Sequence, residues 1–170
     1  MNIETAHSTD RLYTEIAELL NSARQAVATQ VNTALLATYW NVGRLIVEDE
    51  QNSQQRAEYG KQILQALSKK LTKEFGKGFS RPNLHWMRLL YIKYPICQTL
   101  SNKLSWSHYC ELLTIADDDK RSFYEKECIN ARWSFRELKR QIDSSLFERL
   151  LLSDGMANKE KVYQLATNIQ

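Results

Sequence analysis

The sequence predicts an all-α domain of five to seven helices. Gly and Pro, which mark turns and interrupt regular structure, are scarce, with 5 Gly and 2 Pro in 170 residues. Apolar residues recur at steps of three and four along most of the chain, the spacing of an amphipathic helix. Hydrophobic residues make up 43% of the chain and charged residues 25%. This is ordinary globular composition, so we expect a buried core.

The apolar pattern that begins at Leu12 predicts either one long helix or two helices with a break near residues 28–32. Asp10 is the expected N-cap, because its carboxylate can accept a hydrogen bond from the first turn. Gly43 lies inside the pattern and costs about 1 kcal/mol of helix stability relative to Ala, which is offset if it permits close helix packing. Residues 50–58 are polar and without period, so they predict a loop or a frayed helix end.

A helix, a glycine-containing turn and a second helix follow, over residues 58–75 and 81–94, with the outline of a helix-turn-helix. Gly76 stands where a helix commonly ends in a positive-φ residue. Ser80 is the expected N-cap of the second helix, and Pro95 ends it.

Later helices are marked by their N-terminal signals. Ser105 or Ser107 can cap a helix through residue 113, and the acids at 117–119 favour the start of a helix to about residue 130. Ser134 and Glu137 form a capping box that predicts a helix to about residue 151. We therefore expect a helical domain over residues 1–152, followed by a linker or short helix over 153–170.

Positive charge is concentrated between residues 60 and 94. This stretch contains eight Lys and Arg residues and a single acid, Glu74. Such clustering is typical of nucleic-acid-binding proteins, although solvated helix faces also show it. In a helix-turn-helix the first residues of the second helix reach base edges. The residues expected to face bases or backbone are Arg81, Asn83, His85 and Arg88. The residues expected to meet phosphates are Lys69, Lys70, Lys73 and Lys77.

The alternative is a purely structural helix pair. The helix at 81–94 is apolar nearly all round, and a helix of that kind is usually buried between other helices or in an oligomer interface. The second hypothesis for the function of this chain is therefore an oligomerisation or protein-partner module.

Catalytic, metal and cofactor sites are not expected. The D-x-K at Asp118–Lys120 resembles a nuclease motif, but such sites need a strand scaffold, so helix capping is the preferred interpretation. The three His share no metal-ligand spacing, and the three Cys have the wide spacing of reduced cytosolic thiols. No run of about 18 apolar residues predicts a membrane span, and no signal pattern precedes the domain, which favours the cytoplasm.

Several motifs in order, over residues of about 12–152, resemble the N-terminal domain of the YhcG-type family, a bacterial domain of unknown function. The segments that carry the resemblance are 37–46 (ATYWNVGRLI), 59–61 (YGK), 67–71 (LSKKL), 75–84 (FGKGFSRPNL), 104–109 (LSWSHY), 121–124 (RSFY) and 133–142 (WSFRELKRQI).

The resemblance implies a helix-turn-helix or winged-helix-like domain for DNA binding or assembly, joined to a nuclease-like domain of the PD-(D/E)XK class. The chain ends at Gln170, about where that domain would begin, so we expect either the N-terminal domain alone or a short member of the family. The expected function is DNA targeting for a nuclease, without catalysis by this chain itself.

Overall fold

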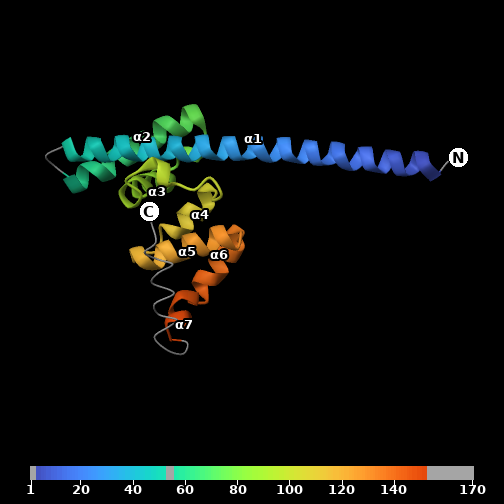
Figure 1. Cartoon of the computed structure of the whole chain (residues 1–170). Coiled ribbons are helices and arrows are strands. Elements are labelled where there is room, and N and C mark those ends of the chain that lie inside the picture. Colours follow the sequence, from blue (N-terminus) through green and yellow to red (C-terminus); the bar gives the residue numbers. More distant parts are fainter. Residues whose placement is uncertain (1–2, 53–55, 153–170) are drawn as a thin grey trace.

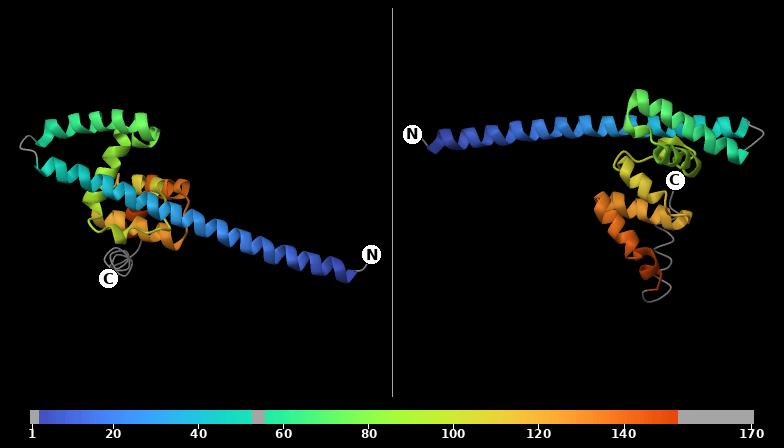
Figure 2. Two further views of the ribbon diagram at one scale, coloured as in Figure 1. Left: turned by 90° about the horizontal axis from the view of Figure 1, so that it is seen from above. Right: turned by 180° about the vertical axis from the view of Figure 1, so that it is seen from behind.

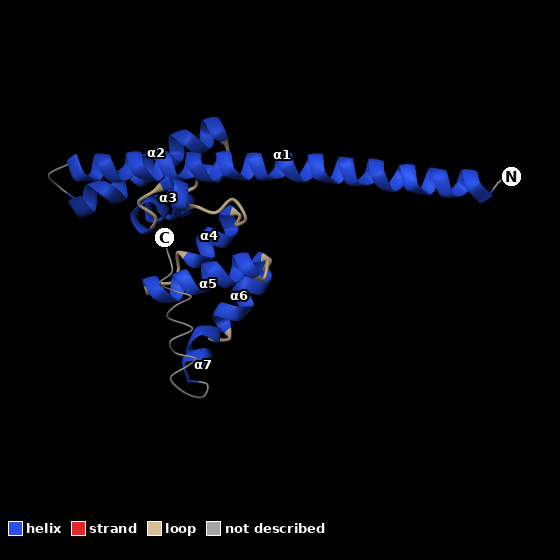
Figure 3. Cartoon of the chain, in the orientation of Figure 1, coloured by secondary structure: helices blue, strands red, loops and turns tan. Residues whose placement is uncertain are grey.

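The structure, a computed structural model, describes residues 3–52 and 56–152. These residues form seven α-helices, two short 3₁₀ helices and no strand (Figure 3), which confirms the all-α prediction. The helices are α1 (Ile3–Asn52), α2 (Arg56–Phe75), η1 (Lys77–Phe79), α3 (Arg81–Lys93), η2 (Cys97–Thr99), α4 (Trp106–Leu112), α5 (Asp118–Asn130), α6 (Phe135–Asp143) and α7 (Leu146–Leu152). Because a winged helix needs strands for its wing, the winged-helix-like prediction is not confirmed in the described part. The predicted linker at 153–170 lies outside it.

The helix α1 is one continuous helix of 50 residues, so the predicted alternative of two helices with a break near 28–32 is wrong. No Gly or Pro interrupts its hydrogen bonds in that stretch. It begins at Ile3, so Asp10 lies inside the helix and is not its N-cap. At 1.5 Å per residue the helix is about 75 Å long. Its N-terminal half projects beyond the rest of the protein (Figures 1 and 2).

The C-terminal half of α1 packs against α3, and Gly43 makes this possible. A Cβ atom at Gly43 would overlap the Met87 carbonyl oxygen, so only glycine allows the two backbones to come this close. Beside this contact the rings of Trp40 and Tyr91 meet edge to face, 5.0 Å between centroids. The Trp40 indole N–H donates a 2.6 Å hydrogen bond to the Tyr94 carbonyl, which fixes the end of α3 on α1.

The turn between α2 and α3 is close to the prediction. Gly76 follows α2 with φ of 89°, a conformation that favours glycine. Ser80 occupies the N-cap position of α3 as expected, but its side chain makes no capping hydrogen bond. The loop predicted at 50–58 is shorter than expected, because α1 continues to Asn52 and α2 begins at Arg56.

Two hydrophobic clusters make up the core. One lies between α1, α2 and α3 and includes Leu84 and Met87, both fully buried. The other joins Leu36 of α1 and the end of α3 to α4–α7, and its largest fully buried side chains include Tyr109 and Tyr124. Trp106 packs against both clusters. The clusters therefore form one body, which lies along the C-terminal half of α1 (Figure 1).

The predicted helix from Ser134 to about residue 151 is two helices. Ser134 caps the first of these as predicted, since its Oγ accepts the Glu137 N–H at 3.3 Å, but the Glu137 carboxylate accepts from Arg140 and Gln141 rather than closing the predicted capping box. The helix then ends at Asp143, and Ser145 has φ of 52° before α7 begins. The break positions Phe147, whose backbone N–H donates to the Tyr124 hydroxyl at 3.2 Å and whose ring packs on Phe123. Burial of that aromatic ring outweighs continuation of the helix.

No helix in the described residues is long and apolar enough to cross a membrane. Cys97, Cys110 and Cys128 are free thiols, and Cys128 is buried. Burial raises the pKa of the Cys110 thiol to about 12 and that of Cys128 to about 11. Both thiols are therefore protonated near neutral pH and are poor nucleophiles.

Candidate nucleic-acid interface

The structure places six of the eight predicted nucleic-acid-binding residues on an exposed surface. We call this surface the cationic edge. It comprises Lys69, Lys70, Lys73, Lys77, Arg81 and His85, all exposed. They come from the C-terminal end of α2, from η1 and from the first two turns of α3, which follow one another directly. These three elements also pack against one another, which brings the six residues into one region of the molecule.

The cationic edge is not neutralised by the protein itself. Among the side chains that the structure describes, no ion pair involves any of its lysines or Arg81, although nine other ion pairs are present. Glu74 is the single acid between residues 62 and 94. The backbone N–H groups at the start of α3 add partial positive charge beside Arg81. The surface is therefore suited to a polyanion such as a phosphate backbone.

Asn83 does not belong to this exposed surface. Its side-chain oxygen accepts a 2.9 Å hydrogen bond from the Trp106 indole N–H, and its amide nitrogen donates to the Gly78 carbonyl. Asn83 thereby ties η1, α3 and α4 together. To read a base, as the sequence suggested, it would have to leave both partners.

Arg88 shares the exposed side of α3 with Arg81 and His85, but it is already paired. Its Nε–H donates to both carboxylate oxygens of Glu50 on α1, at 3.0 and 2.7 Å. The pair is only partly exposed, with 29% of the Arg88 side chain and 12% of the Glu50 side chain accessible. The net charge that Arg88 offers to a ligand is therefore small, and its contact with α1 is structural.

The acidic D-x-K segment is structural as well. Asp117 caps α5, because its Oδ1 accepts the Lys120 N–H at 2.8 Å. Asp118 pairs with Lys93 and Arg121, at 2.8 Å in both cases, and these two cations hold the pKa of its carboxyl below the usual range. The Lys120 ammonium pairs with Glu148 on α7. Within the described residues, no group of three or more His, Cys, Asp or Glu side chains is placed to hold a metal ion.

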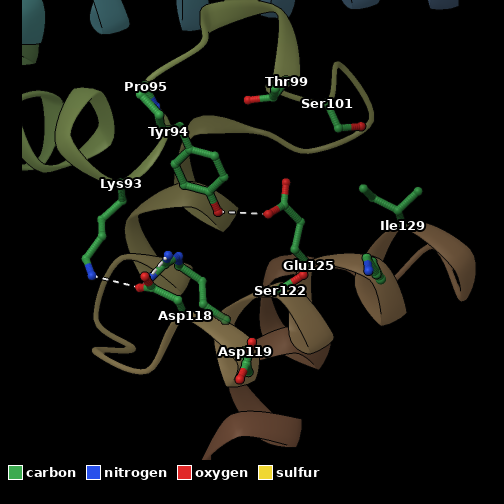
Figure 4. Close-up of a pocket in the computed structure, with 12 residues that line it drawn as sticks. Lys93, Tyr94, Pro95, Thr99, Ser101, Asp118, Asp119, Ser122, Glu125 and Ile129 are labelled. Atoms are coloured by element: carbon green, nitrogen blue, oxygen red, sulfur yellow. Dashed lines mark hydrogen bonds and ion pairs between the residues drawn. The ribbon is translucent and has the colours of Figure 1, made fainter. Parts of the chain in front are cut away.

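A pocket that the sequence did not predict lies between the end of α3, the loop after it, and α5 (Figure 4). Its volume is about 440 Å³, within the range of small-molecule sites. The Tyr94 hydroxyl donates a 2.8 Å hydrogen bond to Glu125 at its centre. Burial raises the pKa of the Glu125 carboxyl, although the Tyr94 hydroxyl and Arg121 partly oppose the shift.

The same pocket includes Lys126, whose ammonium is buried and has no hydrogen-bond partner within the described residues. The Glu125 carboxyl and the Lys126 ammonium together can hydrogen-bond a small polar molecule in this pocket. One sequence feature points to this site. Arg121 and Glu125 are charged residues one turn apart in a helix whose neighbours Phe123, Tyr124 and Cys128 are buried.

Comparison with known proteins identifies relatives of the chain. The family model described as DUF1016 N-terminal domain matches residues 15–149. A protein of Escherichia coli (strain K12), named Putative nuclease YhcG, is 38% identical over 175 aligned positions, which cover 84% of this chain and 47% of that protein. The chain therefore spans about half the length of the curated relative it matches. No solved structure matches it.

The comparison corrects one expectation. From the sequence we expected that the chain is not an enzyme. The relative from Escherichia coli, which matches most of the chain, bears the name Putative nuclease YhcG, and this finding overturns that expectation. Nuclease association, which the resemblance implied, agrees with both matches.

Proposed function

The chain belongs to the DUF1016 N-terminal domain family, and from this premise we propose that it is the DNA-binding part of a nuclease and acts in the cytoplasm. In this proposal α2, η1 and α3 act as a helix-turn-helix-like unit. The lysines of the cationic edge contact phosphates, and Arg81 and His85 lie nearest the bases. Arg88 and Asn83 support the unit from within, through Glu50 and Trp106.

The observation that carries the proposal is the exposed and unpaired charge of the cationic edge. Five Lys and Arg side chains project from adjoining turns without an acidic partner among the described side chains. Holding like charges together costs free energy unless a polyanion neutralises them. Phosphates spaced along a nucleic-acid backbone supply that charge and release counterions when they are bound.

The test is binding of the chain to a labelled DNA duplex across a salt series. We expect affinity to fall steeply with salt, since each neutralised phosphate adds about −0.9 to the slope of log K against log salt. The variant Lys69→Gln/Lys73→Gln/Lys77→Gln/Arg81→Gln should bind much more weakly and lose up to about 3.6 from the magnitude of that slope.

A matched control removes the same number of exposed cations elsewhere. The variant Lys103→Gln/Arg132→Gln/Arg136→Gln/Arg149→Gln keeps the cationic edge and changes net charge by the same amount. It should bind with a nearly unchanged slope. Equal losses in the two variants would show that net charge, not this surface, drives binding. RNA and single-stranded DNA competitors then decide which nucleic acid is preferred.

Nuclease activity is measured separately, by incubating the pure chain with the same duplex and Mg²⁺ or Mn²⁺. Cleavage that co-purifies with the chain would place the reaction within these 170 residues. Binding without cleavage would assign the chain the binding step alone.

A second candidate function, assembly with a protein partner, is supported by a different surface. The projecting half of α1 exposes eight large apolar side chains, from Leu12 to Leu35, that the body of the protein does not cover. This surface is separate from the cationic edge, so the two functions are compatible.

A further inference from the structure

The exposed apolar side chains of α1 lie along one side of the helix, which we call the outer face. It consists of Leu12, Tyr13, Ile16, Leu19, Leu20, Val27, Val31 and Leu35, each between 39% and 73% exposed. At 100° per residue these positions fall within a stripe about 160° wide. Arg24, near one edge of the stripe, is the single charged residue between Leu12 and Leu35 that falls within it. A stripe of this kind is found where one helix packs against another.

The outer face points away from the body of the protein. The body packs against Leu36, Tyr39, Gly43 and related positions of α1. Val27 lies nine residues before Leu36, which is about two and a half turns at 3.6 residues per turn. It therefore projects from the opposite side of the helix. The views from the side and from above agree that the N-terminal half of α1 extends free of the other helices (Figures 1 and 2).

A helix in this position needs a cover to be stable. Isolated helices are marginal in water, and most helix stability in proteins comes from packing of an apolar face. Asn32 hydrogen-bonds α1 to the body, because its amide donates to the carbonyls of Asn102 and Leu104. Most of the apolar outer face, from Leu12 to Val31, lies on the turns before Asn32, where the side chains are exposed.

We propose that a second copy of this chain covers the outer face, so that two α1 helices pair along their N-terminal halves. The inference rests on the second candidate function, assembly, and does not depend on DNA binding. The eight side chains are each 39–73% exposed, so a second copy can bury a continuous apolar area along several turns, as a stable interface of about 800 Å² per partner requires. A two-fold symmetric contact uses the same patch on both copies, and a mainly apolar stripe with its one cation near the edge is complementary to itself.

The charges of the projecting half agree with self-association. Arg11 and Glu15 pair on its solvent side, 80% and 61% exposed, and both signs occur along the helix. Two copies therefore meet without strong repulsion. Because the body lies on the opposite side of α1, the second helix can approach without clashing with it.

The test is the mass of the 170-residue chain by light scattering and sedimentation over a wide concentration range. We expect twice the chain mass of 19.9 kDa, and a return to the single-chain mass in the variant Leu20→Glu/Val27→Glu. Glutamate favours helix formation, so the substitutions act on the contact rather than on helix propensity. The control Ile96→Glu/Leu152→Glu changes two residues that are 56% and 84% exposed elsewhere, and should keep the wild-type mass.

Helix content by circular dichroism supplies a second readout. Dilution of the wild type should lower helix content together with mass, since the projecting half loses its cover. A wild type that keeps the single-chain mass at all concentrations would overturn the inference, and so would a Leu20→Glu/Val27→Glu variant with wild-type mass. DNA affinity, measured on the same samples, separates failure of this inference from failure of the DNA-binding proposal.

Discussion

At the scale of single residues, Gly43 controls how closely α1 approaches α3. Ala at this position would place Cβ against the Met87 carbonyl oxygen and 2.7 Å from its carbonyl carbon, and neither backbone atom can move unless the helices separate. Helix propensity alone would make Gly43→Ala stabilising by about 1 kcal/mol. We expect the overlap to dominate, so that the free energy of unfolding falls by roughly 1–3 kcal/mol.

Urea denaturation of Gly43→Ala measures this effect. The matched control is Gly78→Ala, where the nearest atom to a new Cβ is the Tyr39 hydroxyl oxygen at 3.8 Å. That variant should stay within about 0.5 kcal/mol of the wild type. A stabilised Gly43→Ala variant would mean that α1 and α3 are farther apart than described here.

Protonation of the buried Glu125 carboxyl should make the stability of the protein depend on pH. Burial raises its pKa above the ordinary value of 4.5 in the folded protein. The protonated form is therefore favoured by folding, and this contribution to stability is full below pH 4.5 and is lost as pH rises through the folded-state pKa. Glu125→Gln removes the charge while keeping an acceptor for the Tyr94 hydroxyl.

Thermal unfolding between pH 4 and pH 8 checks this prediction. Relative to the wild type, Glu125→Gln should gain stability as pH rises from 4.5 towards neutrality and then remain constant. Glu127→Gln on the same helix removes one carboxylate and should follow the wild-type profile. Parallel profiles for the wild type and Glu125→Gln would contradict a raised pKa at this site.

At the scale of elements, mutations at the start of α5 test whether the acids at 117–119 cap the helix or take part in catalysis. Asp117→Ala removes the side chain that accepts the Lys120 N–H, and should cost about 1 kcal/mol. Asp119→Ala, an exposed first-turn acid, should cost no more than a few tenths of that through the helix dipole. Urea denaturation gives both values. Equal stability of the two variants would contradict the cap, and loss of cleavage in Asp118→Ala, the first residue of the D-x-K, would favour a catalytic role.

Most elements could be predicted from the sequence because their signals are local. Gly76, Asp117 and Ser134 mark helix ends through backbone conformation and capping, which need no tertiary information. The break before α7 could not be predicted in this way, since it depends on where the Phe147 ring finds its partners. The continuity of α1 was one of two alternatives, because apolar periodicity does not distinguish a straight helix from two collinear ones.

The candidate site was likewise only partly predictable from the sequence. Clustered lysines are visible in the sequence, and the structure adds that they are exposed and unpaired among the described side chains. The sequence could not show that Asn83 is held by Trp106 or that Arg88 is held by Glu50, because those partners lie 23 and 38 residues away. The pocket around Glu125 is likewise assembled from α3, α5 and the loop that follows α3.

At the scale of the whole molecule, the two proposed surfaces are carried by separate parts. The projecting half of α1 contributes no residue to either core cluster, whose first member in the chain is Leu36. The cationic edge belongs entirely to α2, η1 and α3. The body should therefore fold and bind DNA without the projecting half, while assembly should require it.

A chain lacking residues 1–30 tests this division. It keeps Asn32 with its hydrogen bonds to Asn102 and Leu104, so the body loses none of its described contacts. We expect single-chain mass, an unfolding transition of the body close to that of the Leu20→Glu/Val27→Glu variant, and an unchanged salt slope per bound chain in DNA titrations. Apparent affinity for a long duplex should fall, because two linked binding surfaces gain effective concentration that single chains lack. Loss of the salt slope itself would show that the projecting half contacts DNA directly, and the cationic edge would then be only part of the interface.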